Sequence, residues 1–572
     1  MHVLTAAEMQ ACDRATTERF GVASIDLMRA AAGAVAAFAR AQFPRARRVT
    51  VLCGRGNNGG DGMMAARLLG QAGPAGAGLD VTTLLLGAPE GFSTDVVTAW
   101  GELLAAAAPG SVHVVETAEQ LAAHAEALKA DLIVDGVVGT GFKPPLKGLA
   151  LAAWEWVKGS GAQVLAVDLP SGWGADATAA SAAGSVLQPA NKDLSAGAPV
   201  FPADAVITFT APKPAHVFGQ LTRRWDQPVV VTPIGSPEEA IVSKLGVDWA
   251  GSALDLVRTP RAWGANKGSF GHVLVVGGTF GAAGGRAGAP TMAALAALRS
   301  GAGLVTAAVP APALAVVAAV APELMTWPLA ATAAGAISAE SLTPEALTAL
   351  LAGKTVLAIG PGIGQAAETV KFVTGLLAAT KIPAVIDADA LNILAAKPVL
   401  LAKLARRGER TMVLTPHPGE MARLAGITVA EVQANRLKVA RGFAEKFGVT
   451  LVLKGARTLI AHPDGRVAVN TTGNPGMAKG GSGDLLTGLV AGLLAQFSAD
   501  AARAVEAAVC LHGLAADLAV RGPEANQDEH TLLATDSLRQ FSRAFRFDSR
   551  GENGYVWLQG ALHRAAPDEV RG

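Results

Sequence analysis

The stretch from Asn474 to Leu486, NPGMAKGGSGDLL, combines residue types that suit chemistry on a phosphate group. Its glycines leave backbone N–H groups uncovered. The apolar run from Leu485 to Leu494 has helical spacing and predicts a helix whose positive end adds to the same site. Asp484 falls in the first turn, where a carboxylate suits deprotonation of an alcohol that attacks a phosphoryl group. Taken alone, this motif is more often a glycine-rich turn with an N-capping aspartate.

A second glycine-rich loop, Gly54 to Gly62 (GRGNNGGDG), directly follows a predicted strand and precedes an apolar helix. Ligands of open α/β sheets bind at the carboxyl ends of such strands. The loop matches neither a P-loop nor the fingerprint GxGxxG, and its asparagines and aspartate add side-chain amides and oxygens. The alternative is a purely structural turn, because Asn and Gly are common turn residues.

Oxygen-bearing side chains follow two further strands of the first half. Asp135 lies in VDGVVGTGF, and Asp168 and Ser171 lie in VDLPSG. With Asn58, the residues Asp135 and Ser171 offer the oxygen ligands that a hard cation accepts. Asp168 then remains as the candidate for proton transfer. Each aspartate alone is equally a helix cap or turn former, but three similar strand ends favour a shared site.

Motifs in the second half also follow predicted strands. His417 lies between two prolines, and this rigidity favours a ligand contact, although a lone histidine is more often a packed or surface residue. Asp387 and Asp389 suit either a metal ion or a helix cap, and the sequence does not separate these roles. The motifs are Gly360 to Gly364 (GPGIG), Asp387 to Asn392 (DADALN), Thr415 to Glu420 (TPHPGE) and Lys454 to Thr458 (KGART).

The elements that must position these motifs alternate between strands and helices. Helices are predicted at Thr5–Arg19 and Ser24–Arg40, and short apolar runs between helical stretches predict α/β domains with parallel sheets buried on both faces. The predicted strands are Val49–Leu52, Val81–Leu86, Leu132–Val134, Val164–Val167 and Ala205–Phe209, then His272–Val276, Leu304–Ala308, Val356–Ile359, Ala384–Ile386, Met412–Leu414 and Thr450–Leu453.

The length of 572 residues predicts at least two domains. We place them at residues 1–232 and 240–545, separated by a Pro- and Gly-rich interruption. Residues 546–572 turn polar and aperiodic, which predicts a weakly ordered tail. The uncharged segment from Gly303 to Pro322 is broken by prolines, and we interpret it as a buried strand, a turn and a core helix rather than a membrane span.

Composition excludes several classes of partner. The 48 Lys and Arg residues balance 47 Asp and Glu residues, and no basic stripe appears, so nucleic acid is not expected. Three scattered cysteines indicate a reducing compartment. The polar N-terminus is unlike a signal peptide. We therefore expect a cytoplasmic protein that uses small-molecule substrates and no membrane, and we also expect a homo-oligomer.

The motifs NNGGDG, VDGVVGTGF and VDLPSG together resemble the NAD(P)H-hydrate epimerase family over roughly residues 1–230. The resemblance implies a Rossmann-like three-layer sandwich that interconverts the R and S epimers of hydrated NAD(P)H. It also implies that Asn58, Asp135 and Ser171 hold a potassium ion and that Asp168 is catalytic. The segment 174–200 is longer and richer in alanine than the segment that usually follows DLPSG in this family. The implied substrate-binding residues are Asn57, Asn58, Gly59, Gly60, Asp61, Gly139, Thr140, Gly141, Phe142, Lys143, Pro144, Pro145 and Asp168.

The order of the second-half motifs resembles the ADP/ATP-dependent NAD(P)H-hydrate dehydratases, which have a ribokinase-like three-layer sandwich fold. TPHPGE with KGGSGDLL is the specific pair. The resemblance implies that Gly362, His417 and Asp484 contact the hydrated nicotinamide. The nucleotide-binding residues that it implies are Lys454, Gly455, Ala456, Arg457, Thr458 and Gly483.

Together the two resemblances imply repair of hydrated NADH and NADPH. In this hypothesis Asp484 deprotonates the C6 hydroxyl, which attacks the terminal phosphoryl group of ADP or ATP with the help of Mg²⁺; AMP or ADP and phosphate are the products. The first half would convert the R epimer to the S epimer that the dehydratase accepts. The alternative is a ribokinase-like small-molecule kinase with a non-catalytic N-terminal binding domain.

Overall fold

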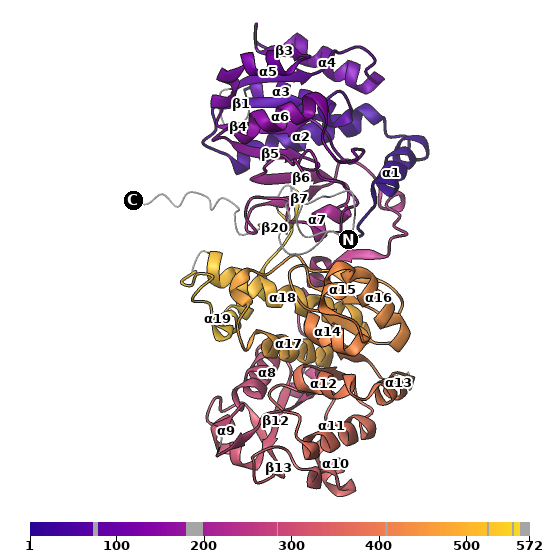
Figure 1. The fold of residues 1–572 in the computed structure, drawn as a ribbon, viewed down its shortest axis with the longest axis vertical. Coiled ribbons are helices and arrows are strands. Elements are labelled where there is room, and N and C mark those ends of the chain that lie inside the picture. The colour runs from indigo at the N-terminus through magenta and orange to yellow at the C-terminus, as the bar shows by residue number, and fades with distance from the viewer. Residues whose placement is uncertain are drawn as a thin grey trace. The chain divides into compact units, whose positions relative to one another are not determined.

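The computed structural model describes residues 1–560 except for 73–77, 179–197, 283, 407–409, 523–524 and 552–553 (Figure 1). These residues form two compact units. The first contains Met1–Val247 together with the chain from Asp548, and the second contains Asp248–Phe547. The long segment noted at 174–200 lies largely outside the described residues.

The first unit is built on one eight-stranded sheet. Across the sheet the strands are β20 (Val556–Gln559), β7 (Val229–Thr232), β6 (Ala205–Phe209), β5 (Gln163–Val167), β4 (Leu132–Gly136), β1 (Arg48–Cys53), β2 (Asp80–Leu86) and β3 (Val112–Val115). Seven strands are parallel, and β20 runs antiparallel to β7. The five strands predicted for this half are confirmed. The helices are α1 (Ala6–Glu18), α2 (Ser24–Gln42), α3 (Asn57–Gly70), α4 (Thr94–Ala106), α5 (Ala118–Ala123), α6 (Gly148–Lys158) and α7 (Pro214–Phe218).

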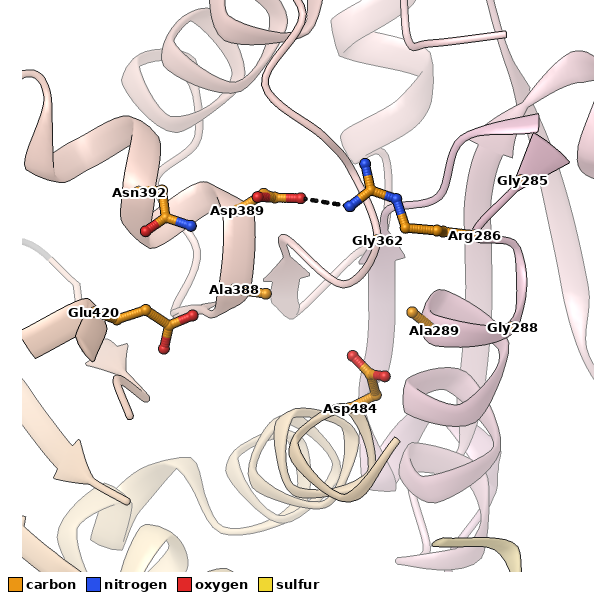
Figure 2. A pocket seen from close by; sticks show the side chains of 10 residues that line it. All are labelled: Gly285, Arg286, Gly288, Ala289, Gly362, Ala388, Asp389, Asn392, Glu420 and Asp484. Atoms are coloured by element: carbon orange, nitrogen blue, oxygen red, sulfur yellow. Dashed lines mark hydrogen bonds and ion pairs between the residues drawn. The ribbon is translucent and has the colours of Figure 1, made fainter. Parts of the chain in front are cut away.

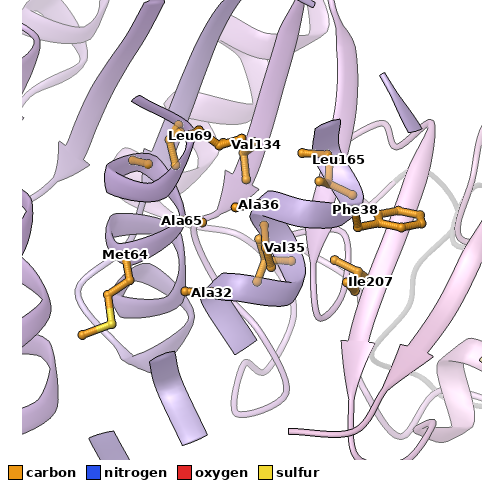
Figure 3. Packing of buried hydrophobic residues seen from close by; sticks show 14 of the residues in the cluster. Ala32, Val35, Ala36, Phe38, Met64, Ala65, Leu69, Val134, Leu165 and Ile207 are labelled. Atoms are coloured by element: carbon orange, nitrogen blue, oxygen red, sulfur yellow. The ribbon is translucent and has the colours of Figure 1, made fainter. Parts of the chain in front are cut away.

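Apolar side chains cover both faces of this sheet. Successive strand residues point to opposite faces, and Val134 packs with α2 and α3 whereas its neighbour Ile133 packs with α6. Figure 3 shows the first of these clusters, in which Val35 and Phe38 of α2 meet strand residues. The predicted three-layer α/β arrangement of the first half is confirmed.

Residues 554–560 correct part of the weakly ordered tail predicted at 546–572; residues 552–553 and 561–572 of that prediction lie outside the described residues. Strand β20 pairs with β7 as an edge strand of the first sheet. Trp557 is buried and stacks edge-on against Phe38, with ring centroids 6.0 Å apart. The hydroxyl of Tyr555 donates a hydrogen bond to the carbonyl of Ala34. Burial of these aromatic rings orders a segment whose polar composition points the other way.

The second unit is built on a ten-stranded sheet. Across it the strands are β13 (Met325–Leu329), β12 (Leu304–Pro310), β9 (His272–Val276), β14 (Val356–Ile359), β15 (Ala384–Ile386), β16 (Met412–Leu414), β17 (Thr450–Leu453), β18 (Leu459–Ala461), β19 (Val467–Val469) and β8 (Val247–Trp249). Strands β13 to β17 are parallel, and β18 and β19 continue antiparallel. All six predicted strands are present. Strands β14 to β17 are buried along their whole length, so helices cover both faces and the predicted three-layer fold is confirmed.

Thirteen α-helices are described in this unit. They are α8 (Gly288–Arg299), α9 (Leu314–Ala318), α10 (Pro344–Leu351), α11 (Ala367–Ala379), α12 (Ala388–Ala395), α13 (Pro398–Arg406), α14 (Pro418–Ala425), α15 (Val429–Ala434), α16 (Arg436–Phe447), α17 (Ser482–Gln496), α18 (Ala501–Arg521), α19 (Ala534–Arg539) and α20 (Phe541–Arg546). Two glycines let α17 lie against α8. A Cβ atom at Gly488 would come within 1.9 Å of the Ala293 carbonyl oxygen, and one at Gly492 within 1.9 Å of the Ser300 hydroxyl. Helix α17 therefore packs closely against α8.

The uncharged segment from Gly303 to Pro322 differs from its prediction in one respect. Strand β12 is buried as predicted, but α9 is a short surface helix and not a core helix. Val317 is buried, whereas Val316 is 49% exposed. Among the described residues no single helix is long and apolar enough to cross a membrane. Helix α17 and the segment Ser498–Arg521 reach that length and apolar composition only when taken together, and the chain bends sharply between them.

Two candidate active sites

Glycines bring the two loops of the first predicted site together. A Cβ atom at Gly54 would lie 1.9 Å from the Val137 carbonyl oxygen, and one at Gly59 would lie 1.8 Å from the Gly54 carbonyl oxygen. The turn from β1 into α3 therefore packs against the loop that follows β4. At Gly139 a Cβ atom would come within 2.9 Å of the Asn58 Oδ1 atom and 3.0 Å of the Asp168 Oδ2 atom. Asn58, Gly139 and Asp168 are thus neighbours, as the motifs predict.

Asp168 is held by a dense set of donors at the end of β5. Its backbone has a positive φ of 65°. Its Oδ2 atom accepts hydrogen bonds from the Thr140 amide at 2.7 Å and from the Thr140 hydroxyl. Its Oδ1 atom accepts from the Thr208 hydroxyl and from Lys213 Nζ, both at 2.8 Å. Burial alone would raise the pKa of Asp168, but the charge of Lys213 outweighs it and holds this pKa well below the usual aspartate range.

His216 fixes the backbone beneath this carboxylate. Its Nδ1 atom accepts a hydrogen bond from the Lys213 amide at 2.9 Å, so the ring proton lies on Nε2. That Nε2 atom donates to the Asp168 carbonyl oxygen at 2.7 Å. Burial, followed by the charge of Lys213, lowers the pKa of His216 to about 4, so the ring is neutral at physiological pH.

The predicted cation ligands lie beside Asp168. Asp135 is fully buried and accepts hydrogen bonds from the Ser171 hydroxyl at 2.6 Å and the Ser171 amide at 2.8 Å. Burial raises the pKa of Asp135 to about 6. The Asn58 side-chain nitrogen is buried and has no hydrogen-bond partner among the described residues. Rotation of this amide to present its oxygen to a cation would therefore break no hydrogen bond.

A cavity of about 820 Å³ opens over this group. Asp61 and Asp13 line it, together with Asp168 and Lys213. Burial and the charge of Asp168 raise the pKa of Asp61 well above its ordinary value. Of the predicted substrate-binding residues, the following line the cavity: Asn57, Asn58, Asp61, Gly139, Thr140, Gly141, Phe142 and Asp168.

Five predicted substrate residues are not among those that line the cavity: Gly59, Gly60, Lys143, Pro144 and Pro145. The sequence motifs missed three residues that hold Asp168, namely Thr208, Lys213 and His216. All three lie at or just after the end of β6, in TFTAPKPAH. The sequence signal that could have identified them is the group of polar residues at the carboxyl end of a predicted strand.

The start of α17 forms the centre of the second site. Gly481 takes the N-cap position with φ of 95°, and no side chain caps this helix. Asp484 lies in the first turn, as predicted, and faces a pocket of about 450 Å³ (Figure 2). Burial, followed by the charge of Asp387, raises the pKa of Asp484 to about 6. Figure 2 shows that this carboxylate points toward the space bordered by Arg286, Asp389 and Glu420.

Lys454 joins three elements behind this pocket. Its Nζ atom lies 2.9 Å from Asp387 Oδ1 and 3.9 Å from Glu420 Oε2. The Thr487 hydroxyl of α17 donates to Asp387 Oδ2 at 2.7 Å. Burial opposes ionisation of Asp387, but Lys454 outweighs it and lowers the pKa of this carboxyl. Asp387 occupies the N-cap position of α12, yet its side chain does not cap the helix; it anchors Lys454 instead.

Asp389 has a different set of partners. It accepts hydrogen bonds from the Gly364 amide at 3.0 Å and from Gln365 Nε2 at 2.9 Å, and it pairs with Arg286 at 3.2 Å. It therefore holds the predicted GPGIG loop, whose Gly362 lines the pocket. Arg286 lies in a glycine-rich stretch in which the sequence analysis singled out no side chain.

His417 caps α14. Its Nδ1 atom accepts hydrogen bonds from the Gly419 and Glu420 amides at 3.0 and 3.3 Å. The side chain is 52% exposed, and partial burial followed by the charge of Lys454 lowers its pKa. His417 is not among the residues that line the pocket around Asp484.

The predicted nucleotide-binding residues follow β17 as one loop, Lys454 to Thr458. A Cβ atom at Gly483 would lie 3.5 Å from Lys454 Nζ, so the structure brings Gly483 and Lys454 together. Arg457 has a positive φ of 55°, and the Thr458 hydroxyl donates to the Gly455 carbonyl at 2.8 Å. The loop lies beside the uncapped start of α17, as the motifs predict.

Each unit thus places ionisable side chains and glycine-rich turns at the carboxyl ends of parallel strands, which is the arrangement of ligand-binding α/β enzymes. Residues 24–215 match the family described as YjeF-related protein N-terminus, and residues 273–537 match the family described as NAD(P)H-hydrate dehydratase. The chain belongs to the family of bifunctional NAD(P)H-hydrate repair enzymes.

Relatives with that name span nearly the whole chain. The enzyme of Moorella thermoacetica is 38% identical over 94% of this chain and 95% of its own length. That of Escherichia coli is 32% identical over 93% and 91%. The crystal structure of the ADP/ATP-dependent NAD(P)H-hydrate dehydratase of Bacillus subtilis, co-crystallised with ATP/Mg²⁺, is 31% identical and covers 53% of this chain and 99% of that chain, with a TM-score of 0.43.

Proposed function

We propose that this protein repairs hydrated NADH and NADPH, with epimerisation in the first unit and nucleotide-dependent dehydration in the second. The names of the full-length relatives support this assignment. The observation that carries it within the chain is the carboxylate of Asp484, which has a raised pKa and faces a pocket beside an uncapped helix start. A base with a pKa near 6 next to a phosphate-binding helix end suits activation of a hydroxyl toward phosphoryl transfer.

In the second unit, Asp484 takes the proton from the C6 hydroxyl of the hydrate. The hydroxyl oxygen then attacks the terminal phosphoryl group of ADP or ATP, and AMP or ADP leaves. Free N–H groups at the start of α17 stabilise the charge on the transferred group. Phosphate then departs from C6, pushed by the electron pair of the ring nitrogen, and loss of a C5 proton restores the dihydronicotinamide.

Lys454 supplies further positive charge at this site, and a magnesium ion would add to it. Lys454 is held by Asp387 next to Gly483, so its charge lies at the edge of the phosphate site. Asp387 and Asp389 are already ion-paired with Lys454 and Arg286. We therefore propose that Mg²⁺ enters on the nucleotide phosphates, where it would offset their negative charge.

In the first unit, Asp168 is the base that moves the proton of the hydrate. The oxygens of Asn58, Asp135 and Ser171 fit a potassium ion, because they combine one carboxylate with neutral oxygens and the Asn58 amide is uncommitted. When bound, the ion would supply positive charge beside the substrate. Thr140 and Lys213 keep Asp168 oriented and ionised.

The test is recovery of dihydronicotinamide absorbance from mixed R and S hydrates of NADH with ADP, ATP or neither. Asp484→Asn should lower dehydration at least about 100-fold, the usual contribution of a general base, and should leave epimerisation intact. Asp168→Asn should stop recovery at the S fraction after correction for spontaneous epimerisation. Full dehydratase activity in Asp484→Asn, or accumulation of a stable phosphorylated product by the wild type, would contradict the proposal.

A further inference from the structure

Two of the carboxylates that line the cavity of the first unit, Asp168 and Asp61, have opposite environments. Asp168 accepts hydrogen bonds from two hydroxyls, one amide and the ammonium of Lys213. The Asp61 carboxylate, on α3, has no hydrogen-bond or ion-pair partner among the described residues, and it lines the same cavity of about 820 Å³. Pairs of carboxyl groups whose surroundings differ in this way commonly divide the roles of acid and base.

We propose that Asp61 is the general acid and Asp168 the general base of hydrate epimerisation, with Lys213 as the positioning residue that keeps the two roles distinct. This inference rests on the proposed epimerase function of the first unit. The inference adds to that function because it assigns Asp61 as the second proton-transfer group. It also explains why the buried Lys213 lies behind Asp168.

The charged groups around Asp61 support this division. Asp13 of α1, Asp168 after β5 and Lys213 before α7 act on it electrostatically. Burial raises the pKa of Asp61, and the charge of Asp168 raises it further, which favours the protonated acid. The other charged residues that line the cavity are Arg14, Glu18 and Arg55, and His216, neutral, lies behind Asp168.

Asp13 is the rival for the acid role, because its carboxylate also lines the cavity. Burial and the charge of Asp168 raise the pKa of Asp13 too, but the charge of Lys213 opposes that rise more strongly than the charge of Asp168 supports it. For Asp61 the strongest influence after burial is the charge of Asp168, which favours the protonated form. The charge of Asp168 is thus the dominant charge acting on Asp61, whereas that of Lys213 is dominant for Asp13, so Asp61 keeps its proton more readily.

The proton transfers balance without a further reactant. Asp168 takes the proton of the C6 hydroxyl as the C6–O bond becomes a carbonyl. The C6–N1 bond breaks, its electron pair goes to N1, and Asp61 gives its proton to N1. Rotation about the C5–C6 bond presents the other face of the aldehyde. The reverse transfers then close the ring with inverted configuration and return both carboxyl groups to their starting states.

The experiment measures the epimerisation rate against pH in the full-length protein, starting from pure R hydrate of NADH. The wild type should lose rate at high pH as Asp61 ionises. Asp61→Asn should lower the rate at least about 100-fold and abolish that high-pH limb, and Asp61→Glu should restore the limb and part of the rate. Dehydration of pure S hydrate by the same samples checks that the chain is folded.

Loss of the high-pH limb in Asp13→Asn, or its retention in Asp61→Asn, would overturn the assignment. A wild type that does not epimerise at all would instead count against the proposed function. Lys213→Met should raise the pKa of Asp168, so its low-pH limb should move to higher pH, whereas Lys213→Arg should keep the limb near the wild-type position. An unmoved limb in Lys213→Met would refute the positioning role.

Discussion

At the scale of single residues, burial and one neighbouring charge decide what each carboxylate can do. Asp387 and Asp484 are close enough to interact electrostatically, yet Lys454 lowers the pKa of Asp387 while burial raises that of Asp484 to about 6. The same contrast separates Asp168 from Asp61 in the first unit. In each unit, the carboxylate that is paired with a lysine stays ionised, whereas the second carboxyl group has no such partner among the described residues and has a raised pKa.

The dehydration rate should consequently depend on pH through Asp484. The base acts when ionised, so the rate should fall as the pH drops through about 6. Asp387→Asn removes the charge that raises this pKa, so the falling limb should move to lower pH. Thr487→Val removes the hydrogen bonds of this hydroxyl to Asp387 and to the Gly483 carbonyl oxygen but no charge, and it should leave the limb in place. A limb that stays at pH 6 in Asp387→Asn would show that Asp484 is not the titrating base.

Gly139→Ala tests the contact between the two loops of the first site. The new Cβ atom would lie within about 3.0 Å of both Asn58 Oδ1 and Asp168 Oδ2, so both side chains must move and epimerisation should fall at least about tenfold, because small misplacements of catalytic groups are costly. Gly101→Ala on α4 is the matched control, since nothing lies within 4 Å of its Cβ position. It should raise stability by about 0.5–1 kcal/mol. Unchanged epimerisation in Gly139→Ala would contradict this geometry.

At the scale of elements, edge strand β20 completes the first sheet from the far end of the chain. It pairs with β7, and its buried Trp557 contacts Phe38 of α2. The strand contributes no residue to either candidate site. Substitutions in β20 should therefore change activity only by changing the stability of the first unit.

Trp557→Ala should therefore destabilise the first unit by about 3–5 kcal/mol, the usual cost of truncating a buried aromatic residue. Urea denaturation should show epimerase activity lost at lower denaturant than in the wild type, while dehydratase activity keeps its midpoint. Leu533→Ala, at a position that is 55% exposed, is a control with little expected effect. Equal shifts of both activities in Trp557→Ala would contradict separate unfolding of the units.

Helices and strands could be predicted from the sequence better than contacts between residues far apart in the chain. Strands such as β14 and β15 are continuous apolar runs, and burial on both faces imposes that pattern. Asp484 was found because glycines and a helix start surround it in the sequence. Lys213 was missed because its partner Asp168 is 45 residues away. Strand β20 was missed because the strand that stabilises it lies more than 300 residues earlier.

At the scale of the whole molecule, each unit contains a complete candidate site made from its own residues. Under the proposed function, the R hydrate is converted in one site before it is consumed in the other. The two sites can therefore work in sequence if the S hydrate diffuses from the first site to the second.

A mixture of Asp168→Asn and Asp484→Asn chains should accordingly restore complete recovery of NADH from mixed hydrates, although neither variant achieves it alone. The first variant supplies dehydration and the second supplies epimerisation. Absorbance at saturating nucleotide is the measurement, with each variant alone at doubled concentration as control. Failure of the mixture would mean that the intermediate passes only within one chain.

The return of the chain to the first sheet also bears on how the protein is made. The residues of the second unit are inserted, along the chain, between β7 and β20. On the ribosome the second unit can fold as soon as α20 emerges, whereas the first unit keeps one edge of β7 unpaired until β20 emerges. An exposed strand edge is a template for aggregation. A gene divided after residue 247 would therefore yield an epimerase half that lacks its own edge strand, and a half that carries that strand without its sheet.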